Sequence, residues 1–92
     1  MDKFIKFFKA ESNYTHIYYN DGSRQMFART LKKFEDSLVG KGFFRAHHSY
    51  LVNVKSIVRV SSLGLILECG AVIPISRKLS RKDVKKILTF NH

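Results

Sequence analysis

The sequence predicts a mostly β domain made of short antiparallel strands with one or two short helices. Short apolar segments rich in aromatic and β-branched residues recur along the chain, as is typical of strands. Gly-containing turn signals separate them, and one internal segment, residues 30–39, instead has apolar residues at helical spacing. The chain of 92 residues is long enough for one domain, and we expect that domain to span residues 1–92.

The first three strands are expected between residues 4 and 28. Residues 4–10 (FIKFFKA) and 16–19 (HIYY) have β-prone composition, and the polar residues 13–15 (NYT) separate them. The sequence Asn20-Asp21-Gly22-Ser23 predicts a hairpin, because Asp-Gly suits the positive φ angles of tight turns. Residues 25–28 would form the returning strand.

Residues 30–39 (TLKKFEDSLV) predict a short amphipathic helix that covers one side of the sheet. The apolar positions at helical spacing are Leu31, Phe34 and Leu38. Thr30 can cap the start through its hydroxyl, and Gly40 stands where a glycine commonly ends a helix. Lys32 and Lys33 are expected on the solvated face.

The rest of the chain predicts four more strands and a terminal helix. The strands are expected at residues 50–53, 56–61, 65–69 and 71–75, with turns at Leu63-Gly64 and Cys69-Gly70. Pro74 cannot donate a ladder hydrogen bond, so its strand should be an edge strand or end there. A capping-box pattern at Ser80-Arg81-Lys82-Asp83 predicts a helix with Val84, Ile87 and Leu88 facing inward.

Charge is the strongest compositional property of the chain. Seventeen Lys and Arg face seven acids, giving a formal net charge of +10 and a pI near 10.1. This imbalance indicates a polyanionic partner, which could be DNA, RNA or an acidic membrane surface; a basic solubilising surface is the plainer alternative. No apolar run approaches the roughly 20 residues of a membrane span. One cysteine, Cys69, excludes an internal disulfide, so we expect a reducing, cytoplasmic setting. The apolar stripe of the predicted terminal helix is needed to cover the sheet, so we expect no membrane partner.

Three polar clusters lie next to the predicted strands, where binding residues commonly sit. The clusters are Asn13, Tyr14, Thr15 and His16; Arg45, His47, His48 and Ser49; and Ser76, Arg77 and Lys78. Arg77 is the strongest candidate, because a guanidinium can bond guanine bidentately. Ser76 and Lys78 suit phosphate oxygens. Each cluster also has a plain alternative: an exposed arginine, a structural histidine or an ordinary turn.

The two adjacent histidines carry a further expectation about geometry. Neighbouring residues of an extended segment point to opposite sides, so at most one of His47 and His48 should face DNA if that segment is a regular strand.

Catalysis is not expected from this sequence. The seven acids are scattered and do not cluster with the histidines, and the sequence contains neither a Gly-rich phosphate loop nor a nucleophile elbow. We therefore predict no enzyme activity and no cofactor. A module that binds RNA or a protein remains the alternative to a DNA-binding domain, because the tyrosines and phenylalanines could stack on bases.

Four blocks of sequence together resemble the LytTR DNA-binding domain of bacterial response regulators. They are ESNYTHIYYNDG, LKKFEDSL, FFRAHHSYLVNVKSI and GAVIPISRK, in the same order and spacing over roughly residues 4–79. The resemblance implies an elongated, mostly β fold whose loops enter the major groove of tandem direct repeats in promoters. By position, the contacts would come from residues 13–16, from residues 47–49 and from Arg77.

The resemblance also implies a regulatory context, and this sequence differs from the family pattern at two places. Family members often bind as two copies along one DNA face, so self-association is possible. His48 stands where the family commonly has Arg or Asn, which affects base preference. The family domain usually begins well before the segment matching residues 4–10. We therefore expect the first strands to be missing, in a fragment following a receiver domain or in a stand-alone member whose open sheet edge could self-pair.

Overall fold

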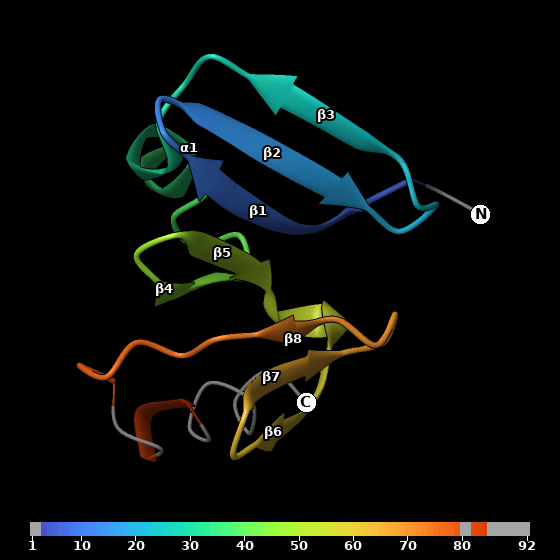
Figure 1. Ribbon diagram of the computed structural model, residues 1–92, viewed down its shortest axis with the longest axis vertical. Helices are drawn as coiled ribbons and strands as arrows, with labels where there is room; N and C mark the ends of the chain where they lie inside the picture. Colours follow the sequence, from blue (N-terminus) through green and yellow to red (C-terminus); the bar gives the residue numbers. More distant parts are fainter. Residues whose placement is uncertain (1–2, 80–81, 85–92) are drawn as a thin grey trace.

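The computed structural model describes residues 3–79 and 82–84, which form two antiparallel β-sheets and short helices (Figure 1). The first sheet has the order β3-β2-β1-β5-β4, and the second has the order β6-β7-β8. The strands are β1 (Ile5–Glu11), β2 (Tyr14–Tyr19), β3 (Arg24–Phe27), β4 (Phe43–His47), β5 (Tyr50–Asn53), β6 (Ile57–Ser61), β7 (Gly64–Leu67) and β8 (Val72–Ile73). The helices are α1 (Leu31–Ser37) and the 3-10 turn η1 (Val54–Ser56). The mostly β prediction is confirmed.

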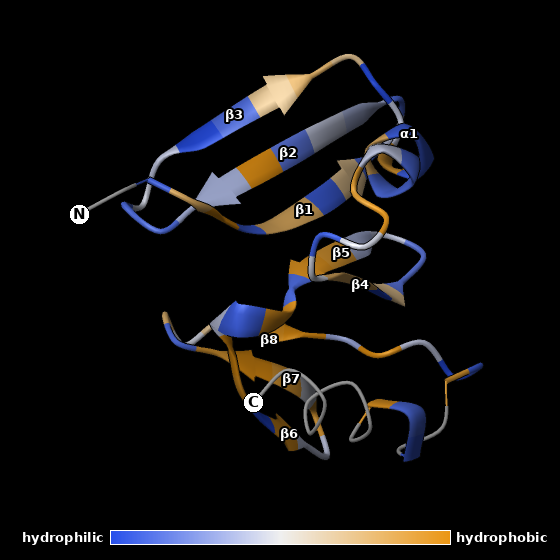
Figure 2. Ribbon diagram, turned by 180° about the vertical axis from the view of Figure 1, so that it is seen from behind, coloured by the Kyte–Doolittle hydropathy of each residue, from blue (hydrophilic) through white to orange (hydrophobic). Residues whose placement is uncertain are grey.

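β1 lies at the centre of the first sheet and has a buried side chain on each face. Phe8 and its cross-strand neighbours Ile17 and Leu51 form one core with Leu31 of α1. Phe7 points to the other face, because successive strand residues alternate. Its core contains Phe7, Ala46, Val52, Ile57, Leu65, Leu67, Ile73 and Val84. This core on the Phe7 face joins the two sheets. The hydrophobic strands of the second sheet are visible in Figure 2.

The helix forms where it was predicted, but it is shorter and lacks the expected cap. Thr30 has an extended backbone at the N-cap position, yet its side chain makes no capping hydrogen bond. The helix ends at Ser37, and the N–H of Leu38 donates to the carbonyls of the preceding turn at 3.1 Å. The ring of Phe34 lies 5.0 Å from that of Phe8, so packing on the sheet holds the helix in place.

The hairpin predicted at residues 20–23 is confirmed. The N–H of Tyr19 donates to Ser23 O at 3.0 Å, and Gly22 has the positive φ of 88° that this turn requires. The Asp21 carboxylate accepts from the N–H of Ser23 at 2.8 Å. The hydroxyl of Ser23 donates to the same carboxylate, and these hydrogen bonds from the side chain and backbone of Ser23 lower the pKa of Asp21.

Several boundaries differ from the predicted ones. β2 begins at Tyr14, and residues 43–47 form a strand of their own, β4, where the sequence predicted a polar cluster and no strand. The strand predicted over 56–61 begins one residue later, after η1. β8 ends at Ile73 at the sheet edge, as the presence of Pro74 predicted.

The terminal helix is described in part. Residues 82–84 are helical, and Val84 is buried as predicted, whereas Ile87 and Leu88 lie outside the described residues. None of the helices in the described part of the chain is long and apolar enough to cross a membrane.

The elongated outline implied by the resemblance is not seen. The principal axes measure 33 × 32 × 25 Å, so the two longest dimensions are nearly equal. The physical reason is the shared core: residues of β5 and of the second sheet pack together, which places the sheets against each other.

We expect Gly64→Ala to be strongly destabilising. A Cβ at this position would lie 2.2 Å from the carbonyl oxygen of Ile73, and the φ of +140° already disfavours a side chain. Strain and overpacking together should lower the free energy of unfolding by roughly 3 kcal/mol, as measured by urea denaturation. Gly40→Ala is the control, because its φ of +77° is strained but its Cβ meets no atom within 4 Å. Equal losses in the two variants would contradict the steric explanation.

Candidate nucleic-acid interface

Three chain segments gather on one side of the molecule. They are the turn between β1 and β2, the turn between β4 and β5, and the chain that follows β8, all on the left in Figure 1. Two backbone hydrogen bonds link their surroundings: the N–H of Ala10 donates to Ser49 O at 2.8 Å, and the N–H of Ser76 donates to Ala46 O at 2.7 Å. The structure thus brings together the three polar clusters that the sequence places far apart.

The loop expected over residues 13–16 is shorter than predicted. Asn13 is exposed and Tyr14 is 45% exposed, but Thr15 and His16 belong to β2 and are buried. The Thr15 hydroxyl donates to Arg29 O at 2.6 Å, so it holds the chain that leads into α1. Thr15 and His16 are therefore buried residues that support the β1–β2 turn, and only the tip of this turn reaches solvent.

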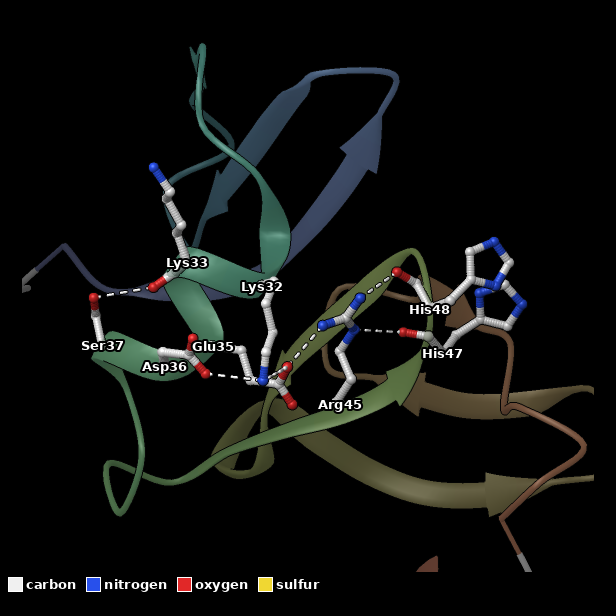
Figure 3. Close-up of polar contacts among 8 residues, drawn as sticks. All are labelled: Lys32, Lys33, Glu35, Asp36, Ser37, Arg45, His47 and His48. Carbon is white, nitrogen blue, oxygen red and sulfur yellow. Dashed lines mark hydrogen bonds and ion pairs between the residues drawn. The ribbon is translucent and has the colours of Figure 1, made fainter.

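The turn between β4 and β5 places two imidazole rings side by side. The ring centroids of His47 and His48 are 4.3 Å apart with an interplanar angle of 33° (Figure 3). The expectation that they point to opposite sides holds only for a regular strand, and the strand is not regular there. The β4–β5 register shifts between Arg45 and His47, and the chain turns at residues 48 and 49.

Arg45 holds this turn to the helix (Figure 3). Its guanidinium donates to Glu35 Oε1 at 2.8 Å, to His47 O at 3.0 Å and to His48 O at 2.5 Å. Its side chain is only 27% exposed. Arg45 was predicted as a DNA contact, and in the structure its guanidinium has three intramolecular acceptors, which connect the turn to α1. Glu35 was missed, because no local pattern links a helix residue to a strand ten positions away.

His47 is set up as a neutral hydrogen-bond donor. Its Nδ1 accepts from the N–H of Ser49 at 3.2 Å, which leaves the ring proton on Nε2. Burial lowers the pKa of His47, and the nearby charges of His48 and Arg45 lower it further. At neutral pH this ring can therefore donate one hydrogen bond without carrying a charge.

The chain after β8 presents the exposed cations. The N–H of Lys78 donates to Ser76 Oγ at 3.3 Å, and the N–H of Leu79 donates to Ser76 O at 3.1 Å, so Ser76 organises a turn. Arg77 and Lys78 are exposed at its tip. Within residues 3–79 and 82–84, the Arg77 guanidinium has no ion pair or hydrogen bond, and it is free to bind an external acceptor.

Sequence reasoning missed a lysine beside the histidine turn. Lys9 of β1 pairs in register with His16 on one side and Tyr50 on the other, and its Nζ lies 6.0 Å from the centroid of the Tyr50 ring. Only the strand register brings Lys9 to this place, so no sequence signal pointed to it. Among the described residues, no three His, Cys, Asp or Glu side chains are grouped so as to hold a metal ion.

We expect Arg45→Lys to loosen the turn. Lysine cannot reach three acceptors with a planar fork, so the free energy of unfolding should fall by about 1–2 kcal/mol. Urea denaturation measures this change. Arg59→Lys, on the exposed part of β6, is the matched control and should change stability by less than about 0.5 kcal/mol. Equal effects would show that the three hydrogen bonds do not stabilise the turn.

We expect the stability of the fold to fall with decreasing pH in a way that depends on His47. Its folded-state pKa lies below the ordinary value of 6.5, so the unfolded chain binds the proton more readily. The contribution is therefore complete above about pH 7 and is lost as pH falls through 6.5 toward the folded pKa. His47→Gln should lose less stability than the parent between pH 7.5 and pH 5 in thermal melts. His48→Gln retains the burial of His47 and should keep most of the loss, and an unchanged His47→Gln profile would contradict this assignment.

Comparison with known proteins identifies the family. The family model of the LytTr DNA-binding domain matches residues 3–89. Among solved structures, the LytTr DNA-binding domain of a response regulator from Bacillus cereus is similar, with 22% identity and a TM-score of 0.75. The match covers 91% of this chain and 80% of that chain, and it shows the fold. No curated protein matches the sequence. This chain belongs to the LytTR family of non-catalytic DNA-binding domains, so it is a DNA-binding domain of a bacterial regulator.

Proposed function

We propose that this domain binds specific double-stranded DNA sequences in bacterial promoters, with the side carrying the three segments inserted into the major groove. One observation supports this most directly: Arg77, Lys78 and the paired histidine rings lie on the side where two backbone hydrogen bonds hold the turns together. Turns fixed by a sheet present side chains in a defined geometry, as base recognition requires.

Affinity and specificity come from different residues in this proposal. Lys78, Lys9 and the hydroxyl of Ser76 suit phosphate oxygens, which fix the position of the protein on the duplex. Arg77 has an unoccupied guanidinium and reads a guanine through O6 and N7. At the neighbouring turns, Asn13 suits adenine, and the rings of His47 and His48 contact a base edge or phosphate.

Four further predicted residues act as supports. Thr15, His16 and Arg45 are bonded within the domain, and the carbonyl of Ser49 receives the hydrogen bond from β1. They hold the turns without touching DNA.

Direct repeats suit the dimensions of the domain. Its two long axes of 33 and 32 Å are close to the roughly 34–36 Å of one DNA turn. Two copies in the same orientation therefore fit on one face of the duplex at sites one turn apart. The domain acts as the output of a transcriptional regulator in the cytoplasm, and a receiver domain is the expected source of its control.

The packing of Tyr18 and Phe27 on the first sheet favours DNA over single-stranded RNA. A single-strand reader exposes several rings on one sheet face, as stacking platforms. Here Tyr18 is half-buried, and its ring stacks on Phe7 at a centroid distance of 4.5 Å. Phe27 is 40% exposed but packs edge-on against Phe34. The rings of these residues are thus used within the fold.

Fluorescence anisotropy titrations test the proposed function. The labelled ligands are a duplex with motifs selected by the protein from a random library, a scrambled duplex and a single-stranded RNA, each at two salt concentrations. Preference for the selected duplex should survive the higher salt, whereas nonspecific binding should collapse. Equal binding of all three ligands, lost together in salt, would refute sequence-specific recognition.

Arg77→Ala should cost roughly 1–3 kcal/mol of binding free energy on the selected duplex and less on the scrambled one, because it removes a base contact. Arg59→Ala is the matched control, since Arg59 is exposed on β6 in the other sheet. Lys32→Ala should also have little effect, because Lys32 Nζ is already paired with Asp36 at 3.0 Å. An equal loss for Arg77→Ala on both duplexes would remove its role in base reading.

A further inference from the structure

An acidic side chain lies within the basic surface proposed to face DNA. Glu11 is the last residue of β1, next to the turn at Ser12 and Asn13. The preceding residue, Ala10, donates its N–H to Ser49 O at 2.8 Å, so the backbone beside Glu11 is bonded to the histidine turn. Ser12 has a φ of 56°, an uncommon conformation for a residue with a side chain, and it turns the chain sharply after Glu11.

Glu11 is held in place by a buried partner. Its Oε2 lies 2.6 Å from Nε2 of His16, whose side chain is only 10% exposed, whereas the Glu11 side chain is 70% exposed. A glutamate on a surface normally samples several rotamers, and fixing it costs conformational entropy. Here the buried imidazole provides the anchor before any ligand binds. A carboxylate offers about four lone-pair sites, so the bond to His16 leaves acceptor capacity open to solvent.

The chemistry of an exposed, fixed carboxylate at this place selects one base. Phosphates repel it, so it gains nothing from the DNA backbone. In the major groove a carboxylate accepts from the exocyclic N4 amino group of cytosine, whereas guanine presents acceptors at O6 and N7. Adenine offers one donor but sets the N7 acceptor beside it.

We propose that Glu11 is a specificity-determining residue that reads a cytosine in the target site, and that His16 positions its carboxylate. This inference rests on the proposed function, because it requires the β1–β2 turn to enter the major groove. In this proposal an acidic side chain contacts a base alongside the basic residues, and the Glu11–His16 pair contributes to specificity as well as to stability. The pair also reduces the repulsion between Glu11 and phosphate, because the ring N–H donates to the carboxylate.

The test is a binding selection from a random duplex library, followed by sequencing, with the parent chain, Glu11→Gln and Glu68→Gln. Glutamine keeps an oxygen that can accept from His16, but it pairs bidentately with adenine through N6 and N7. Glu68→Gln removes the same charge from an exposed residue in the turn after β7, on the right in Figure 1. Thermal melts of the three proteins check that each is folded.

The parent should enrich a motif with one position that favours cytosine, and Glu11→Gln should shift that position toward adenine by about fivefold or more. The Glu68→Gln motif should match that of the parent. An unchanged Glu11→Gln motif overturns the inference and leaves the proposed function intact. Loss of preference at every position, with a lowered melting temperature, also overturns it, because Glu11 would then serve stability alone. A parent that enriches no motif refutes the proposed function and this inference with it.

Discussion

The structure depends on the burial of two adjacent strands on both faces. In β1 and β5, consecutive large side chains point to opposite sides: Phe7 and Val52 to the core shared with the second sheet, Phe8 and Leu51 to the core under α1. A shift of one residue would exchange these faces and expose both cores. The register is therefore strongly specified, and the ends of β1 and β5 meet at a fixed position. The proposed DNA-contacting turns adjoin these strand ends, so their position is fixed as well.

Polar residues near the turns divide into supports and free groups. Thr15, His16 and Arg45 are buried or half-buried and bonded within the domain, whereas Arg77 and Lys78 are exposed at a tip. The supports make hydrogen bonds to backbone carbonyls or carboxylates, which offsets the cost of removing them from water. Such anchors reduce the motion of the neighbouring turns. A preorganised surface loses less entropy on binding, so more of its contact energy appears as affinity.

The proposed recognition of DNA by the turns at the strand ends has a physical consequence for specificity. Each turn presents only a few side chains, so three turns from two sheets must be held in a common geometry. Hydrogen bonds from Ala10 to Ser49 and from Ser76 to Ala46 provide this link across the first sheet and to the chain after β8. The net charge of +10 supplies attraction to DNA that does not depend on sequence. In the proposed binding mode, the arrangement of the turns supplies the selectivity that charge alone cannot.

Local sequence patterns determined most of the elements, though not β4, and also the Asp-Gly hairpin and the end of the edge strand before Pro74, because each depends on a few neighbouring residues. The family, too, was predicted from four blocks of sequence and is confirmed. Only the tertiary structure decided that His47 and His48 lie side by side, that Arg45 binds Glu35, and that His16 is buried against Glu11. These contacts depend on a register shift, on helix packing and on where a strand begins. All three follow from long-range burial, which no local pattern encodes.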